Sequence, residues 1–196
     1  MTASENTLAS GKFFRFWSAA NEPRAVVLIS HGLGEHSGRY EHVAAALTAD
    51  NLDVYAPDHI GHGKSPGKPA YIDRFSDLTS GVSELRDHIR RHYAGLPVIL
   101  IGHSMGGLIA IRLVLGAHAD YAGLILTGPL LGQPEAPSRL QVMLLRVLSV
   151  LAPKVKAIEI DASAVSRDPA VVSDYIADPL VHHDNIPART LVSLLD

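Results

Sequence analysis

The 196-residue sequence has no cysteine, which excludes a disulfide framework and any metal site built from thiolates. It also has no excess of basic residues. The formal net charge is -3 with both signs scattered, so we expect no nucleic-acid partner. No apolar run approaches the length of a membrane span, and residues 1–12 lack the apolar core of a secretory signal. With 47% hydrophobic residues, the composition predicts one globular, cytoplasmic domain with a substantial core.

The most informative stretch is Pro97–Leu108, which reads Pro-Val-Ile-Leu-Ile-Gly-His-Ser-Met-Gly-Gly-Leu. A β-branched run typical of a buried strand leads to Ser104, and an apolar run long enough for a helix follows. This is the Gly-x-Ser-x-Gly pattern of a nucleophile elbow, where the serine takes a strained backbone conformation. Glycine at Gly102 and Gly106 removes side chains that would collide across the turn. The pattern predicts Ser104 as a nucleophile, with the Met105 amide pointing into the same space.

Strand and helix patterns alternate along residues 13–127. Continuous apolar runs, typical of strands covered on both faces of a parallel sheet, occupy 25–30, 52–56, 98–101 and 123–127. Apolar residues at helical spacing occupy 40–49, 75–95 and 108–117. The mixed segment 13–19 is predicted to be an exposed or edge strand. This order predicts an α/β fold with a mostly parallel sheet, helices on both faces, and a site at the carboxyl ends of the strands.

An acyl-transfer site needs a second amide beside that of Met105, to hold the negative oxygen that forms on the substrate. His31-Gly32-Leu33-Gly34 follows the first buried strand and therefore reaches the same end of the sheet as Ser104. Gly32 and Gly34 let the backbone N–H groups of this loop turn toward a substrate. We predict that the Leu33 amide is the second oxyanion donor.

Histidines near the elbow and on the second helix suggest two further roles, which we reject. His103 adjoins Ser104, but a neighbour in the elbow projects away from the serine hydroxyl, so we expect a structural role. His88 and His92 lie one helical turn apart. They lack the glutamate that follows the first histidine in the metalloprotease pattern, so we expect no metal there.

Residues 61–65, Gly-His-Gly-Lys-Ser, resemble the end of a phosphate-binding loop. Pro66 and Pro69 prevent the helix whose amino end would hold the phosphate, so we expect no nucleotide. The segment 58–65 is instead predicted to be a rigid loop beside the pocket. The chemistry expected of this chain uses no metal and no cofactor.

Beyond residue 130 the pattern changes to helices broken by prolines, and we predict a core over residues 1–130 and a helical cap or lid over residues 131–196. Within the cap, residues 138–152 predict a helix with unusually wide apolar coverage. Three of its side chains, Leu140, Leu144 and Leu148, are candidates to line an acyl tunnel or to make a peripheral membrane contact. Packing of this helix onto the core is an equally open alternative.

Three motifs together resemble the monoacylglycerol lipase and lysophospholipase group of the α/β-hydrolase superfamily. They are His31-Gly-Leu-Gly-Glu-His-Ser-Gly-Arg-Tyr40, the loop 58–65, and Gly102-His-Ser-Met-Gly-Gly107. The segments 166–169 and 178–183 also resemble the cap of that group. The resemblance implies a serine ester hydrolase with Ser104 as nucleophile and Leu33 and Met105 as oxyanion donors. It further implies a small-molecule substrate, an ester of glycerol with one fatty acyl chain.

The catalytic partners of Ser104 are missing from this pattern. In the fold, the acid and the histidine follow the serine on loops after later strands, and in the family those strands follow the cap. We therefore expect an incomplete version of a longer hydrolase, nearly inactive alone. Its uncovered sheet edge is expected to pair with another chain or with a copy of itself. A rewired triad stays open as an alternative, with Asp161 at the end of a strand over 154–160 and His182 or His183 as base.

Two other functions stay open. One is a catalytically incompetent relative that acts in binding or assembly, and the missing catalytic partners favour it. The other is a hydrolase of different esters or thioesters, because an elbow indicates the mechanism and says little about the leaving group.

Overall fold

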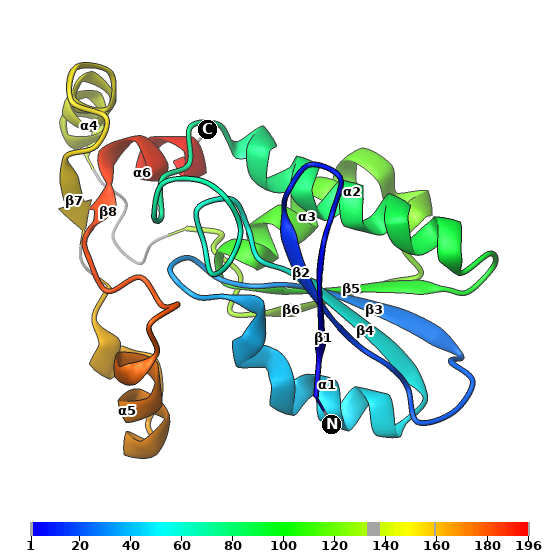
Figure 1. The fold of residues 1–196 in the computed structure, drawn as a ribbon. Helices are drawn as coiled ribbons and strands as arrows, with labels where there is room; N and C mark the ends of the chain where they lie inside the picture. Colours follow the sequence, from blue (N-terminus) through cyan, green and yellow to red (C-terminus); the bar gives the residue numbers. More distant parts are fainter. Residues whose placement is uncertain (1, 133–137, 159, 196) are drawn as a thin grey trace.

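The computed structural model describes residues 2–132, 138–158 and 160–195 (Figure 1). Its main sheet has the strand order β1-β2-β4-β3-β5-β6. The strands are β1 (Ser4–Thr7), β2 (Phe13–Trp17), β3 (Ala25–Ser30), β4 (Leu52–Pro57), β5 (Val98–His103) and β6 (Gly123–Thr127). From β4 to β6 all neighbours are parallel, whereas β1 and β2 are antiparallel additions. The predicted mostly parallel sheet is confirmed.

Helices cover both faces of this sheet (Figure 1). On one face, α2 (Phe75–His92) and α3 (Met105–Ala117) pack against β3 and β5, which contribute Leu28 and Leu100 to the larger core cluster. On the other face, α1 (Glu41–Ala49) packs against Val27 and Ile29 of the same strand β3. Both faces of β3 are therefore buried, which explains its unbroken apolar sequence.

The prediction of an edge strand at 13–19 is wrong. Strand β2 lies between β1 and β4, and Phe13, Phe14 and Trp17 are buried. The polar residue Arg15 suggested exposure, but its side chain is also buried because Asp58 and Ser37 bind its guanidinium. The edge is instead β1, whose exposed sequence Ser-Glu-Asn-Thr carries no apolar signal.

The segment after residue 137 lies beside the sheet (Figure 1). Its elements are α4 (Arg139–Leu151), β7 (Lys156–Ile158), α5 (Pro169–Ala177), β8 (Ile186–Pro187) and α6 (Ala188–Leu195). Three short 3-10 helices complete the described chain: η1 (Ser37–Tyr40), η2 (His118–Asp120) and η3 (Ala162–Ala164). β7 and β8 form a separate two-stranded sheet, so the strand predicted over 154–160 is present only in part and does not extend the main sheet.

Strand β6 and helix α4 are two of the surfaces on which the described residues expose apolar side chains. Strand β6 ends the sheet on one side, and its residues Leu124 and Ile125 are 36% and 49% exposed. Helix α4 packs against α6, yet it carries exposed apolar side chains along its length. No helix in the described residues is long and apolar enough to cross a membrane.

Candidate active site

Ser104 lies at the turn from β5 into α3 with φ 50° and ψ -118°, a backbone conformation that L-residues rarely adopt. The turn is so tight that a Cβ atom on Gly102 would lie 2.5 Å from the carbonyl oxygen of Gly106. A Cβ atom on Gly106 would collide with the carbonyl oxygen of Ser30. The geometry is that of a nucleophile elbow. Ser104 is half-buried at the carboxyl end of β5.

The loop 31–34 passes directly beside this serine, because a Cβ atom on Gly32 would lie 3.3 Å from the Cβ of Ser104. Among the described residues, the amide N–H groups of Leu33 and Met105 have no hydrogen-bond acceptor. Two uncommitted N–H groups on the chain segments that flank a serine are what an oxyanion requires. The structure thus brings the predicted nucleophile and both predicted donor segments together.

A network of buried polar groups holds the loop in place. Glu35 accepts hydrogen bonds from the Gly32 amide at 2.6 Å and from the Tyr40 hydroxyl at 2.7 Å. Nδ1–H of His31 donates to the Gly32 carbonyl at 2.8 Å, which leaves Nε2 to accept from the His59 amide at 3.0 Å. Burial holds the pKa of His31 and of His59 well below the usual range, so both rings are uncharged and support the loop by packing and hydrogen bonding.

Asp58 ties this loop to the one predicted beside the pocket. Its carboxylate is fully buried and accepts bonds from the amide and hydroxyl of Ser37 and from the Lys64 amide. Arg15 lies 3.5 Å away and balances the buried charge. Glu35, Asp58 and Arg15 are positioning residues that were not predicted from the sequence. An acidic residue three positions after Gly32 was the one local signal for Glu35.

His103 is directed toward β6. Its Nδ1 lies 2.9 Å from both the carbonyl and the hydroxyl oxygen of Thr127, in agreement with a structural role. Across the residues that the structure describes, no histidine or carboxylate is hydrogen-bonded to the Ser104 hydroxyl.

The geometry does not assemble the alternative triad. Asp161 is solvent-exposed, and its carboxylate caps η3 by accepting from the amide and hydroxyl of Ser163. His183 contacts the Asp178 carbonyl at 3.2 Å, and the backbone N–H of His182 donates to the Gly34 carbonyl at 2.7 Å. In the described part of the chain, no hydrogen bond joins Asp161 to either histidine.

The three leucines proposed for the cap lie on α4. Leu140 and Leu144 are 60% and 57% exposed, whereas Leu148 is half-buried. Their role in lining an acyl tunnel stays a prediction. The described residues hold no group of three or more His, Asp or Glu side chains that suits a metal ion.

Comparison with known proteins fits this geometry. Residues 21–196 match the family model described as serine aminopeptidase, S33. The monoacylglycerol lipase of Mycolicibacterium smegmatis is 40% identical over 181 residues, which is 91% of this chain and 65% of that protein. Human monoglyceride lipase is 40% identical over 170 residues, which is 86% of this chain and 56% of that protein. The chain therefore spans about 56 to 65% of the length of these relatives.

Solved structures agree in fold. The monoacylglycerol lipase of Paleococcus ferrophilus matches with a TM-score of 0.79 and 32% identity, over 100% of this chain and 70% of that one. A monoglyceride lipase variant from Saccharomyces cerevisiae matches with a TM-score of 0.77 at 22% identity, over 99% of this chain and 66% of that one, and so supports the fold alone. The chain therefore belongs to the S33 serine aminopeptidase family of α/β-hydrolases, in which it resembles the monoacylglycerol lipases.

Proposed function

We propose that this chain is the nucleophile-bearing part of a serine ester hydrolase. One observation carries the proposal: Ser104 occupies the strained turn between β5 and α3, beside the loop 31–34. Its hydroxyl oxygen attacks the ester carbonyl carbon, and the resulting oxyanion accepts hydrogen bonds from the Leu33 and Met105 amides. The alcohol leaves with a proton, an acyl-enzyme forms, and water then releases the fatty acid. This chemistry uses no metal or cofactor.

The proposed substrates are monoacylglycerol-like fatty acyl esters. Support comes from the names of the relatives, which include a monoacylglycerol lipase and several monoglyceride lipases at 35 to 40% identity. The geometry around Ser104 constrains the carbonyl centre rather than the leaving group, so other esters and thioesters remain the competing substrate classes.

The proposal assigns the triad acid and base to segments that follow the cap in longer members of the family. Support comes from the described residues, among which no histidine or carboxylate is hydrogen-bonded to the Ser104 hydroxyl. The 196-residue polypeptide is therefore expected to be nearly inactive alone, because the serine hydroxyl lacks a group to take its proton.

Labelling with a fluorophosphonate probe tests the proposal, because the probe traps a serine that a base activates beside an oxyanion hole. We expect slow labelling of the protein, clear acceleration by free imidazole, which substitutes for the missing base, and no labelling of Ser104→Ala. Rapid labelling without imidazole, abolished by His182→Ala or His183→Ala, would establish the rewired triad instead. No labelling even with imidazole would favour a catalytically incompetent relative.

Helix α4 is the proposed site of peripheral membrane contact. Six apolar side chains on one face of this helix are 49% to 79% exposed: Leu140, Met143, Leu144, Val147, Val150 and Leu151. The buried residue of the helix is Ser149. Exposed apolar area of this kind inserts into the headgroup region of a bilayer. A cytoplasmic location stays a prediction from the sequence.

Vesicle flotation tests this contact. The protein is expected to float with phosphatidylcholine vesicles, and Leu144→Ser with Leu151→Ser is expected to reduce the floating fraction. The matched control is Leu115→Ser on α3, which removes a side chain that is 78% exposed on another surface. Equal floating fractions for all variants would show that α4 does not contact the membrane.

Strand β6 is the proposed surface for pairing with another chain or with a second copy. It ends the described sheet, and its Leu124 and Ile125 are partly exposed. An edge strand with apolar side chains presents unpaired backbone groups that another strand can bind.

A further inference from the structure

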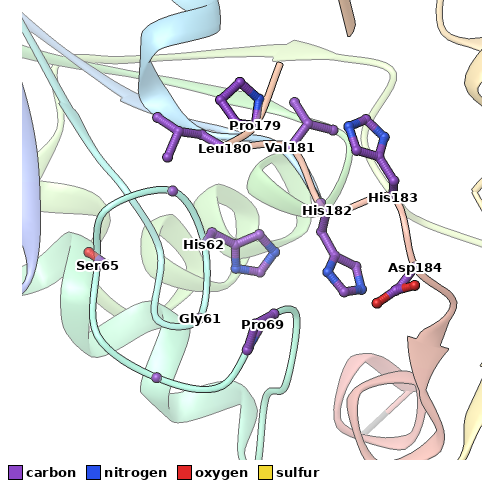
Figure 2. Close-up of a pocket in the computed structure, with 13 residues that line it drawn as sticks. Gly61, His62, Ser65, Pro69, Pro179, Leu180, Val181, His182, His183 and Asp184 are labelled. Carbon is purple, nitrogen blue, oxygen red and sulfur yellow. The ribbon is translucent and has the colours of Figure 1, made fainter. Parts of the chain in front are cut away.

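A cavity of about 440 Å³ lies between the loop 61–69 and residues 179–184 (Figure 2). We call residues 179–184 the cap loop. Gly34 contributes to its wall, but Ser104 does not.

His62 enters this cavity from the loop 61–69. The flanking residues Gly61 and Gly63 have φ angles of 72° and 50°, so the backbone that presents His62 is set by glycine conformations. Its side chain is only 4% exposed. Nδ1 lies 3.0 Å from the Ile60 carbonyl, and because a carbonyl only accepts, Nδ1 carries the proton. Nε2 consequently presents a lone pair, and it is buried with no partner among the described residues.

His182 enters from the opposite wall. Its backbone N–H donates to the Gly34 carbonyl, which fixes the cap loop at this point. Its Nε2 is likewise buried without a partner in the described structure. Figure 2 shows the two imidazole rings turned toward each other across the cavity.

Two buried nitrogen atoms without partners are costly, at about 1 to 3 kcal/mol each, unless something binds them. Imidazole lone pairs are ligands for Zn²⁺, Ni²⁺ and above all Cu²⁺, whereas Ca²⁺ and Mg²⁺ select oxygen. A histidine that binds a metal characteristically donates its other ring N–H to a carbonyl, as His62 does to Ile60.

We propose that His62 and His182 form a two-histidine site for a divalent transition-metal ion, with solvent completing the coordination, and that the bound ion ties the cap loop to the loop 61–69. This site does not depend on the proposed hydrolase activity. The proposed site is distinct from His88 and His92, for which no metal role is predicted. Those two residues lie on α2, and their ring centroids are 4.3 Å apart.

Titration with Cu²⁺, monitored by calorimetry and by electron paramagnetic resonance, tests the proposal. All measurements use a His92→Ala parent, which removes the surface pair on α2. The parent is expected to bind one ion with hyperfine coupling to imidazole nitrogen. His182→Ala should weaken this binding at least about tenfold. Adding His62→Ala should weaken it little further, because the two histidines bind the same ion and the first substitution has already removed that site.

The matched control is His183→Ala. This neighbour lines the same cavity, but its Nε2 contacts the Asp178 carbonyl, so its removal should leave the Cu²⁺ affinity unchanged. Circular dichroism confirms that each variant is folded. Equal affinity of the parent and His182→Ala would overturn the proposal, as would an equal loss in His183→Ala.

Discussion

Ser104 owes its exposure to attack to residues that have no side chain. The role of Gly102 and Gly106 could be predicted from the sequence, because it is steric and local, within two residues of the serine. The positioning role of Asp58 could not, because Arg15 and Ser37 lie 43 and 21 residues away from it. Contacts of that kind depend on strands that are adjacent only in the folded sheet.

Replacing Gly106 with alanine is expected to destabilise the protein by about 3 kcal/mol and to prevent labelling of Ser104. The new methyl group would collide with the carbonyl oxygens of Ser30 and His31, which are backbone atoms that cannot rotate away. Urea denaturation measures the loss.

Gly116→Ala is the matched control for this change. It also lies in α3, but a Cβ atom there meets nothing within 4 Å. Its stability should be equal to that of the wild type or higher by up to about 1 kcal/mol, because alanine favours a helix. Equal stability of both variants would show that the turn accommodates a side chain.

At the scale of elements, the parallel strands and the three core helices could be predicted because their apolar periodicity reflects burial. The way residues 138–195 pack onto the rest of the chain could not. Helix α6 is anchored by Thr190, whose hydroxyl donates to the Ala70 carbonyl at 2.8 Å and accepts from the Ile72 amide at 2.9 Å. A single threonine in a helical pattern carries no signal for a partner about 120 residues away.

Thr190→Val is expected to cost about 1 to 3 kcal/mol of folding stability. Valine fills the same space but leaves a buried N–H and a buried carbonyl without partners. Thermal or urea denaturation measures the effect against Thr79→Val. The Thr79 hydroxyl bonds only within α2, so that change should stay within about 0.5 kcal/mol. A similar small effect at Thr190 would contradict the anchor.

The contact between the oxyanion loop and the cap is expected to depend on pH through Asp178. Burial raises the pKa of Asp178, but hydrogen bonds from His36 and from the Leu180 amide outweigh it and hold the pKa below the usual 3.8. A lowered carboxyl pKa adds stability above the unfolded-state pKa, and this stability is lost as the pH falls through the folded-state pKa.

Asp178→Asn should therefore be less stable than the wild type by about 1 kcal/mol at about pH 7 and about pH 5, with the difference fading below about pH 4. Urea denaturation at each pH measures it. Asp174→Asn, an exposed change on α5 that alters net charge equally, is the control and should show no such trend. A wild-type advantage that is as large at about pH 2 as at about pH 7 would contradict this assignment.

At the scale of the whole molecule, one side of the sheet ends in an open strand. The sequence predicted an uncovered edge, and Leu124 and Ile125 on β6 are partly exposed. What the sequence could not predict is which surface binds what, since α4 is also exposed and apolar.

We expect the protein to self-associate as its concentration rises, because β6 offers unpaired backbone groups beside apolar side chains. Sedimentation velocity should show a rising mean mass for the wild type and a shift toward monomer for Ile125→Lys. Leu115→Lys places the same charge on α3 and should behave as the wild type. A mass unaffected by Ile125→Lys would exclude β6 as the pairing surface.

The central claim, that Ser104 is an acyl-transfer nucleophile, is tested most directly by trapping the acyl-enzyme. Among the described residues no histidine is hydrogen-bonded to Ser104, so imidazole is the base for acylation, and its rapid removal should leave water without an activating base. An acyl group transferred from a monoacylglycerol or a chromogenic ester in imidazole buffer should therefore persist once the imidazole has been removed. Peptide mass spectrometry is predicted to find this acyl group on the peptide that carries Ser104, and Ser104→Ala should show none. An acyl group on another residue, or equal acylation of Ser104→Ala, would contradict the account.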